Sequence, residues 1–410
     1  MMIWNEALRV VLDHALPLGP EMGPVCSSSE GAILAETIVA DLDAPPFDKA
    51  LMDGFALAGE SPAFNEGWPL VNAVYAGDAQ SGRLSQGHAC PVATGARIPD
   101  GADRVVPFER TQKKDGILQV SDIPLSESFL ARAGSDYRAG EVLLNSGTVL
   151  GPATTGALAA AARTAVRMIP IPIVAVISTG DELVEPNRKP MGSQIRNSNG
   201  PMLLSAIHQA GCLPKYLGIA PDCPNTLKNL ILEGLTHPVL ILSGGVSVGE
   251  KDFVRPMLET LGVKVLVHGI KLKPGRPFLF GITQKGGLVF GLPGNPTSAL
   301  ANFDLLIYPA LLAMRGYTNP GPHFQTGIMG EALFANNNRP TLRPVGVKPE
   351  AGEFIVKDLG AKGSFELGVL TRSQGWLELP MGQWDIPKGS EVRILIPKLS
   401  AMVATLLQNA

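Results

Sequence analysis

The chain has 410 residues, of which 45% are hydrophobic and 17% are charged, and its formal net charge is -3. This composition excludes fibrous and intrinsically disordered proteins, and the length allows roughly two to four domains with sizeable cores. No stripe of Lys or Arg is present, so the sequence argues against nucleic acid as a partner.

The cysteines and the N-terminal segment indicate a reducing compartment. Four cysteines lie scattered without the Cys-x-x-Cys spacing of metal sites, in a chain long enough to fold without disulfides. The first residues carry charges at helical spacing, and no run of about 18 apolar residues occurs. We therefore expect a cytoplasmic protein with no membrane partner.

The N-terminal part is predicted to begin with helices and continue as strands. Residues 4–16 and 30–38 have apolar residues at helical spacing, and Pro45 and Pro46 end this pattern. Short alternating runs such as 70–75 and 117–120 then predict a small β-rich domain. A helix over 151–162 follows. It leads to Pro170 and Pro172, which cannot continue a helix and mark a domain boundary.

Beyond this boundary, strands and helices alternate regularly, which predicts a parallel sheet covered on both faces. The expected strands are 173–177, 216–219, 239–242 and 263–267, and the expected helices are 202–209, 226–235 and 253–261. Two further extended runs, 277–280 and 288–291, precede a long helix over 298–314. Short strands, including 391–396, continue toward the C-terminus and predict a second small β domain.

Polar, glycine-rich segments follow three of the predicted strands, at 178–182, 243–252 and 291–298. Ligands of an open parallel sheet bind beyond the carboxyl ends of its strands, so these loops predict a binding site. The segment 243–252 is the most informative, because an amide-rich turn that opens a helix can hold a phosphate. Residues 197–200 add a fourth polar helix start. Lys273 and Arg276 add cations that suit a phosphorylated substrate.

The segment 243–252 also fits the Gly-x-Ser-x-Gly nucleophile elbow of serine hydrolases, with Ser247 as the nucleophile. Such a site needs an acid and a histidine downstream. The available residues are Asp252, Asp304, His268 and His323.

Other known motifs are missing from the sequence. Neither a P-loop nor a dinucleotide-binding fingerprint occurs, and the six histidines form no zinc-binding cluster. Any metal is expected to be bound by oxygen ligands and by the substrate itself. The candidate carboxylates are Asp181, Glu182, Glu250 and Asp252.

Taken in order, these segments resemble the molybdopterin molybdenumtransferase family, the MoeA-type enzymes to which the gephyrin E domain also belongs. The resemblance covers residues 44–380, nearly the whole chain. Each motif alone is weak, but their order and spacing together are highly specific. They lie at 45–56, 94–103, 134–141, 178–183, 197–203, 243–252, 273–277 and 291–298.

The resemblance implies a multidomain α/β plus β protein that forms an elongated homodimer. The central domain is expected to be doubly wound, mostly parallel and similar to the molybdopterin adenylyltransferases, and the C-terminal domain to be β-barrel-like. The active site is expected between the α/β domain of one subunit and the small β domain of the other. The expected domains are a helical linker domain (1–43 and 140–168), an inserted β-rich domain (44–139), an α/β molybdopterin-binding domain (169–317) and a C-terminal β domain (318–410).

The family's activity implies the substrates and the cofactor. Such enzymes take adenylylated molybdopterin and molybdate and, with a divalent cation such as Mg²⁺, release AMP and molybdenum cofactor. Cleaving a pyrophosphate-like linkage needs charge neutralisation and a positioned oxygen nucleophile, which a carboxylate-held cation and cationic side chains supply. Other proteins of cofactor biosynthesis are candidate partners.

The resemblance and the strand-end loops together assign the site residues. Asp53, Asp136, Glu182, Asp252 and Lys273 are assigned catalytic roles, and Glu182 and Asp252 are also assigned to the cation. The substrate-binding assignments are Thr94, Ser178, Thr179, Gly180, Asn199, Asp222, Ser243, Gly244, Gly245, Ser247, Arg276, Pro293, Gly294, Asn295, Pro296 and Ser364.

Other functions also fit part of the pattern. A non-catalytic scaffold like the gephyrin E domain would keep the dimer surface and could lose acids. An adenylyltransferase would resemble only the middle third of the chain. Lys49, Ser135 and Pro238 replace residues usual in the family, which leaves a specialised paralogue open. Tungstate is an alternative to molybdate, because the two oxyanions have nearly the same size and charge.

Overall fold

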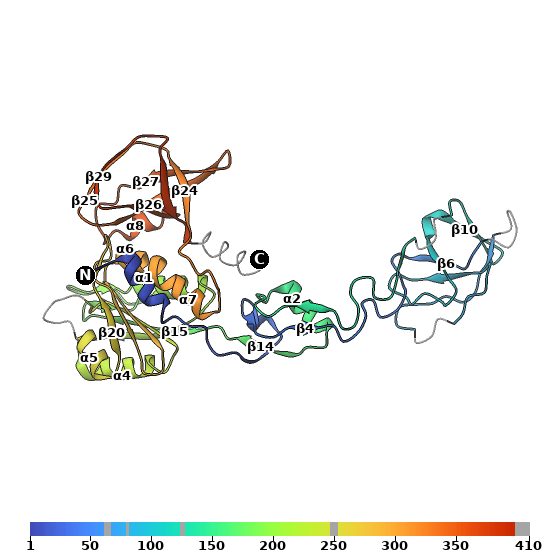
Figure 1. The fold of residues 1–410 in the computed structure, drawn as a ribbon, viewed down its shortest axis with the longest axis horizontal. Helices are drawn as coiled ribbons and strands as arrows, with labels where there is room; N and C mark the ends of the chain where they lie inside the picture. Colours follow the sequence, from blue (N-terminus) through green and yellow to red (C-terminus); the bar gives the residue numbers. More distant parts are fainter. Residues whose placement is uncertain (61–66, 79–81, 124–127, 247–252, 398–410) are drawn as a thin grey trace. The chain divides into compact units, whose positions relative to one another are not determined.

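The computed structural model describes residues 1–60, 67–78, 82–123, 128–246 and 253–397. The chain divides into two compact units. The larger unit comprises Met1–Glu36, Gly147–Pro152 and Ala165–Ala410, and the smaller comprises Thr37–Ser146 and Ala153–Thr164. Figure 1 follows the chain through both.

The larger unit contains a six-stranded sheet. Its strands are β15 (Ile173–Thr179), β18 (Leu213–Ala220), β19 (Val239–Ser243), β20 (Lys264–His268), β22 (Leu279–Ile282) and β23 (Leu288–Leu292). The order is β18-β15-β19-β23-β22-β20. The first four strands are parallel, whereas β22 and β20 are antiparallel to their neighbours. Every residue of β19 and β23 is buried, as expected for strands covered on both faces. The prediction of a mostly parallel sheet is confirmed.

Helices cover both faces of this sheet (Figure 1). One group comprises α1 (Trp4–Leu12), α3 (Asn199–Gln209) and the continuous run of α6 (Pro296–Asn302), the π-helical η3 (Phe303–Ile307) and α7 (Tyr308–Met314); the other comprises α4 (Pro224–Gly234) and α5 (Val254–Thr260). Alternate residues of β15 belong to two separate apolar clusters: Val174 and Val176 to one, Ala175 and Ile177 to the other. This alternation follows from the two-residue period of a strand.

The helical run Pro296–Met314 is apolar enough and long enough to cross a membrane, the one such segment in the described part of the chain. However, 89% of this window is buried inside the fold. Its residues belong to the larger apolar cluster on one face of the sheet. The apolar composition of the run therefore matches its position as a core helix.

The C-terminal part of the larger unit is a closed barrel, which confirms the predicted barrel-like domain. Its strands, in barrel order, are β24 (Phe324–Met329), β27 (Glu353–Asp358), β26 (Thr341–Glu350), β28 (Gly375–Leu379) and β30 (Glu391–Leu395). Val345, Val356, Leu377 and Ile394 fill its interior. The ribbon of β25 (Leu333–Asn337) and β29 (Gly382–Ile386) and the short helix α8 (Leu367–Leu370) complete it.

Short strand pairings complete the larger unit. They are β1 (Met2–Ile3) with β21 (Ile270–Lys271), β16 (Leu183–Val184) with β17 (Ile195–Arg196), and β14 (Ala165–Ile169) between β2 (Glu21–Pro24) and β3 (Ile33–Leu34). A 3-10 turn, η1 (Ser27–Ser29), precedes β3.

The smaller unit is rich in short strands, as predicted. Its pairings are β6 (Gly54–Leu57) between β8 (Ala89–Val92) and β9 (Arg104–Pro107), β11 (Ile117–Val120) between β10 (Thr111–Lys114) and β7 (Trp68–Pro69), β5 (Lys49–Ala50) with β12 (Leu130–Ala131), and β4 (Ile38–Val39) with β13 (Val142–Leu144). The remaining elements are the 3-10 turn η2 (Phe108–Arg110) and the helix α2 (Pro152–Ala160).

Two expected elements were wrong. Residues 30–38 form no helix, because the backbone here forms the short strands β3 and β4, which pair with β14 and β13. Gly31, at φ 81°, also interrupts any helical path there. The segments expected as a helical linker thus contain the helices α1 and α2 and, between them, short strands as well. Residues 70–75 form only isolated bridges from Leu70 to Ala89 and from Val74 to Val92.

Candidate functional site

A cavity of about 610 Å³ lies at the carboxyl ends of the parallel strands. Thr179 ends β15 and Ser243 ends β19, so the strand ends bring loops far apart in sequence to one place. The sequence-assigned residues that line the cavity are Thr179, Glu182, Asn199, Ser243, Gly245, Pro293, Gly294, Asn295 and Pro296.

Asn199 joins three of the loops around this cavity. Its side chain is 7% exposed, and its Nδ2 donates hydrogen bonds to Ser243 Oγ at 2.9 Å and to the Gly294 carbonyl oxygen at 2.8 Å. Its Oδ1 is buried without a partner among the described residues. Asn199 therefore fixes the loops and leaves one strong acceptor unused, which is costly for a buried group unless a ligand satisfies it.

Three assigned residues support the cavity without lining it. Ser178 is buried and accepts a hydrogen bond from Asn197 Nδ2 at 2.9 Å. Gly244 has φ 96°, and a methyl group built on it would lie 2.6 Å from the Thr179 carbonyl oxygen. This close approach of two strand-end loops requires glycine. Gly180 likewise lies against the carboxylate of Glu182.

A second cavity of about 410 Å³ shares Pro277, Pro293 and Asn295 with the first. The assigned residues Lys273, Arg276 and Ser364 lie here rather than in the larger cavity. Five cationic side chains line it, and none of the described residues that line it is acidic. They are Lys273, Arg276, Arg339, Arg343 and Lys362.

Contacts with the barrel position two of these cations. Lys273 donates its backbone N–H to the Pro340 carbonyl oxygen at 2.9 Å, and its own carbonyl oxygen accepts from Leu342 at 2.7 Å. Arg343 is neutralised by Asp358, through two hydrogen bonds of 2.9 and 2.6 Å. Arg339 Nε is buried and has no hydrogen-bond partner in the described chain. The cavity therefore carries excess positive charge suited to an oxyanion.

The smaller unit holds three of the assigned residues. Asp53 Oδ1 accepts hydrogen bonds from the backbone N–H of Thr94 at 2.6 Å and from its hydroxyl at 2.9 Å. These hydrogen bonds lower the pKa of Asp53 and hold it ionised, and the bond from the Thr94 backbone has the larger effect. Asp136 is exposed and donates its backbone N–H to the Ala44 carbonyl oxygen at 2.9 Å. Thus Asp53 and Thr94 form one polar pair.

The remaining assignments have different outcomes. Asp222 is exposed, lines neither cavity, and donates its backbone N–H to Asp181 Oδ1 at 2.9 Å. Ser247, Glu250 and Asp252 lie outside the described residues. No group of three or more His, Cys, Asp or Glu side chains in the described part of the chain could hold a metal ion by itself.

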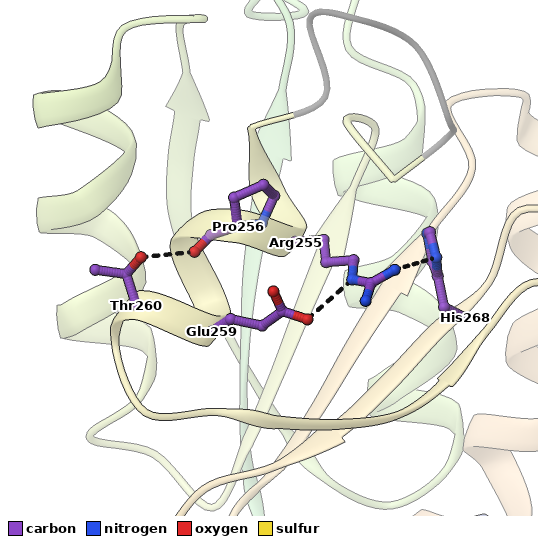
Figure 2. Close-up of polar contacts among 5 residues, drawn as sticks. All are labelled: Arg255, Pro256, Glu259, Thr260 and His268. Carbon is purple, nitrogen blue, oxygen red and sulfur yellow. Dashed lines mark hydrogen bonds and ion pairs between the residues drawn. The ribbon is translucent and has the colours of Figure 1, made fainter.

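Two of the residues available for a serine hydrolase triad, His268 and Asp304, are engaged elsewhere. Figure 2 shows Arg255 of α5 between Glu259 and His268, with Nη1 donating to His268 Nδ1 at 2.9 Å. Burial, and then the charge of Arg255, lowers the pKa of His268. Asp304 is buried and accepts a hydrogen bond from Trp376 Nε1 at 2.7 Å. These contacts argue against the hydrolase reading.

Several residues that line the cavities were missed. Arg196 and Phe365 line the larger cavity, and Arg339, Arg343 and Lys362 line the second. No spacing signal marks the barrel residues, because the fold alone brings them to the strand ends. Arg196 directly precedes the 197–200 segment, and this adjacency in sequence could have predicted that it lines the cavity.

Family models match most of the chain. The model described as MoeA N-terminal region (domain I and II) matches residues 2–162. The model described as probable molybdopterin binding domain matches 175–313, and the one described as MoeA C-terminal region (domain IV) matches 326–396. Most residues that line the strand-end cavity thus lie in the part of the chain matched by the second model, and Phe365 and Leu367 lie in the part matched by the third.

Similar proteins span nearly the full length. The molybdopterin molybdenumtransferase of Haemophilus influenzae is 31% identical over 383 residues, covering 88% of this chain and 90% of that protein. The one from Synechocystis is 32% identical over 369 residues, covering 88% and 91%. A solved structure of the MoeA protein from Pyrococcus horikoshii, at 32% identity, has a TM-score of 0.76 and covers 97% of this chain and 99% of that one. The chain therefore belongs to the MoeA family of molybdopterin molybdenumtransferases.

Proposed function

We propose that this chain is a molybdopterin molybdenumtransferase, which inserts molybdate into adenylylated molybdopterin and releases AMP. The observation that carries the proposal is the pair of adjoining cavities at the strand ends. One is polar, with a buried unused acceptor on Asn199, and the other is lined by five cationic side chains. A large phosphorylated substrate and a small oxyanion need such neighbouring sites.

The two cavities suit the two substrates differently. The larger has the volume for the organic substrate, with Thr179, Ser243 and Asn295 as polar contacts and Arg196 as a cation for phosphate. The second is suited to molybdate, because Lys273, Arg276 and Arg339 attract a dianion and Ser364 offers a hydroxyl donor. The shared residues Pro293 and Asn295 keep the two substrates adjacent.

Mg²⁺ is the proposed cofactor, with Glu182 and Asp252 as its protein ligands. Glu182 supplies to the larger cavity a carboxylate of the type that Mg²⁺ prefers. Since Mg²⁺ usually takes one or two carboxylates together with substrate phosphates, the donor set fits without a preformed cage. When bound, the ion would neutralise charge that develops on the phosphates during cleavage.

We propose further that the protein acts as a cytoplasmic homodimer, in which Asp53, Thr94 and Asp136 of one subunit complete the site of the other. The Asp53 carboxylate is held ionised by Thr94, which prepares it to manage a cation or an incoming oxyanion. Mixing an inactive Asp53→Asn variant with an inactive Glu182→Gln variant should restore part of the activity. No recovery after proven subunit exchange would contradict the shared site.

The test of the activity is AMP release from adenylylated molybdopterin in the presence of Mg²⁺ and molybdate. We expect release to depend on molybdate and to yield cofactor that activates an apo-molybdoenzyme. Tungstate in place of molybdate measures the oxyanion preference. Binding of the substrate without any AMP release would instead support a non-catalytic scaffold.

A further inference from the structure

One short loop of the barrel domain lines both cavities. Residues 361–364 line the cationic cavity, whereas Phe365 and Leu367 line the larger one. The Phe365 side chain is 69% exposed. An exposed phenylalanine alone is ordinary on a protein surface. The position of Phe365 is unusual, because the ring lines a cavity that also carries many polar groups.

Hydrogen bonds to the start of α6 fix this loop on both sides of Phe365. Asn295 Nδ2 donates to Ser364 Oγ at 2.8 Å, and Thr297 donates its backbone N–H to the Ser364 carbonyl oxygen at 3.1 Å. Thr297 Oγ1 donates to the Glu366 carbonyl oxygen at 3.4 Å. The backbone that carries Phe365 is therefore attached to the α/β domain before any ligand binds.

The ring itself also has a defined position. A methyl group built on Gly363 would lie 2.6 Å from Cε1 and 2.8 Å from Cδ1 of Phe365, so the ring lies against the Gly363 backbone. A ring that is already positioned loses little conformational entropy when a ligand packs on it. Flat aromatic ligands gain most from such a surface, because stacking contacts depend on shape and not on a particular polar pattern.

We propose that Phe365 is a specificity-determining residue that stacks on the flat heteroaromatic ring of the organic substrate. The inference rests on the proposed function for the identity of the ring, which is either the adenine or the pterin of adenylylated molybdopterin. Phe365 takes no part in bond cleavage.

Binding of substrate fragments tests the proposal directly. Calorimetric titrations with AMP, with a free pterin and with ribose 5-phosphate would compare the wild type with Phe365→Ala, Phe365→Leu and Phe365→Tyr. We expect the Ala and Leu variants to bind either AMP or the pterin on the order of 10-fold more weakly, and Tyr to bind like the wild type. The ligand whose binding weakens, AMP or the pterin, identifies the ring that stacks on Phe365. Ribose 5-phosphate should bind all four proteins equally.

Phe334 on β25 provides a matched control, because it is 64% exposed and lines neither cavity. Phe334→Ala should leave all titrations unchanged. Thermal unfolding of each variant would confirm that the exposed substitutions leave the fold intact. Unchanged binding of both AMP and the pterin to Phe365→Ala would overturn the proposal, as would an equal loss in Phe365→Tyr.

Steady-state kinetics separate this role from catalysis. We expect Phe365→Ala to raise KM for adenylylated molybdopterin on the order of 10-fold and to leave kcat nearly unchanged, because stacking acts equally in the ground and transition states. A fall in kcat with unchanged KM would contradict the assignment. If the wild type released no AMP at all, the proposed function would fail, but the fragment titrations would still decide the role of Phe365.

Discussion

Trp376 in β28 of the barrel donates its indole N–H to Asp304 Oδ2, 2.7 Å away in the helical run of the α/β domain. Both side chains are buried, at 2% and 8% exposure. Burial raises the pKa of Asp304 from 3.8 to about 7, although the Trp376 hydrogen bond favours the ionised form. The contact between the two domains thus contains a carboxyl group that titrates near neutral pH.

Asp304→Asn should change the pH dependence of stability. The raised pKa means that the folded protein binds a proton that the unfolded chain releases, so the wild type loses stability as the pH rises from about 4 to about 7. The slope from this group is at most about 1.4 kcal/mol per pH unit. Relative to the wild type, Asp304→Asn should therefore gain stability as the pH rises. Denaturant titrations at several pH values measure this, with the exposed Asp115→Asn as a control.

Trp376→Phe removes the indole N–H and leaves the buried Asp304 carboxyl without this hydrogen bond. We expect a loss of roughly 1–3 kcal/mol in the free energy of unfolding, because a buried polar group then lacks its partner. Trp384→Phe, at an indole that is 36% exposed, should cost much less. A double mutant with Asp304→Leu, which removes the acceptor, measures the coupling between the two side chains. Strict additivity would show that the hydrogen bond contributes nothing.

The sequence carried enough information to predict the α/β domain. Alternating buried strands and amphipathic helices produce a strong periodic signal, and the polar loops follow directly from the strand ends. Most of the larger cavity was predicted for this reason. The helix expected over 30–38 was wrong, because apolar residues in a short segment also fit paired strands, and pairing with distant β14 and β13 decided the outcome.

The barrel side of the site could not be predicted by periodicity. Ser364 lies 69 residues after Asn295, to which it is hydrogen-bonded, and only the family resemblance pointed to it. Phe365, Lys362 and Arg339 carry no local signal at all. Their positions depend on how the barrel packs on the α/β domain, which is a property of tertiary structure.

Gly244→Ala tests the close approach of two strand-end loops. At φ 96° an alanine is strained, and its methyl group would lie 2.6 Å from the Thr179 carbonyl oxygen. We expect a loss of roughly 1–3 kcal/mol in stability and weaker substrate binding, since the cavity wall must shift. Gly294→Ala, whose added methyl group meets nothing within 4 Å, is the control for stability alone, because Gly294 itself lines the larger cavity. Equal stability of both variants would contradict the steric argument.

Lys273→Met tests the cationic cavity as an oxyanion site. Losing one of five cations should raise the KM for molybdate on the order of 10-fold and leave the affinity for AMP nearly unchanged. High salt should weaken molybdate binding in the wild type more than in the variant. Lys357→Met, at a side chain that is 68% exposed and lies outside this cavity, is the control. An unchanged KM for molybdate in Lys273→Met would show that this cavity is not the molybdate site.

Asp53→Asn and Glu182→Gln test two of the assigned carboxylates that the structure describes. Each change keeps the size of the side chain and removes its charge, and the amide oxygen introduced by Asp53→Asn can still accept the hydrogen bonds from Thr94. We expect AMP release to fall on the order of 10²-fold or more, because charge stabilisation in the transition state is lost, with little change in thermal stability. Glu233→Gln, at a side chain 51% exposed and paired with Lys215, is the control. If both variants folded normally and released AMP at the wild-type rate, the carboxylates would have no catalytic role, and a binding or scaffold function would explain the site better.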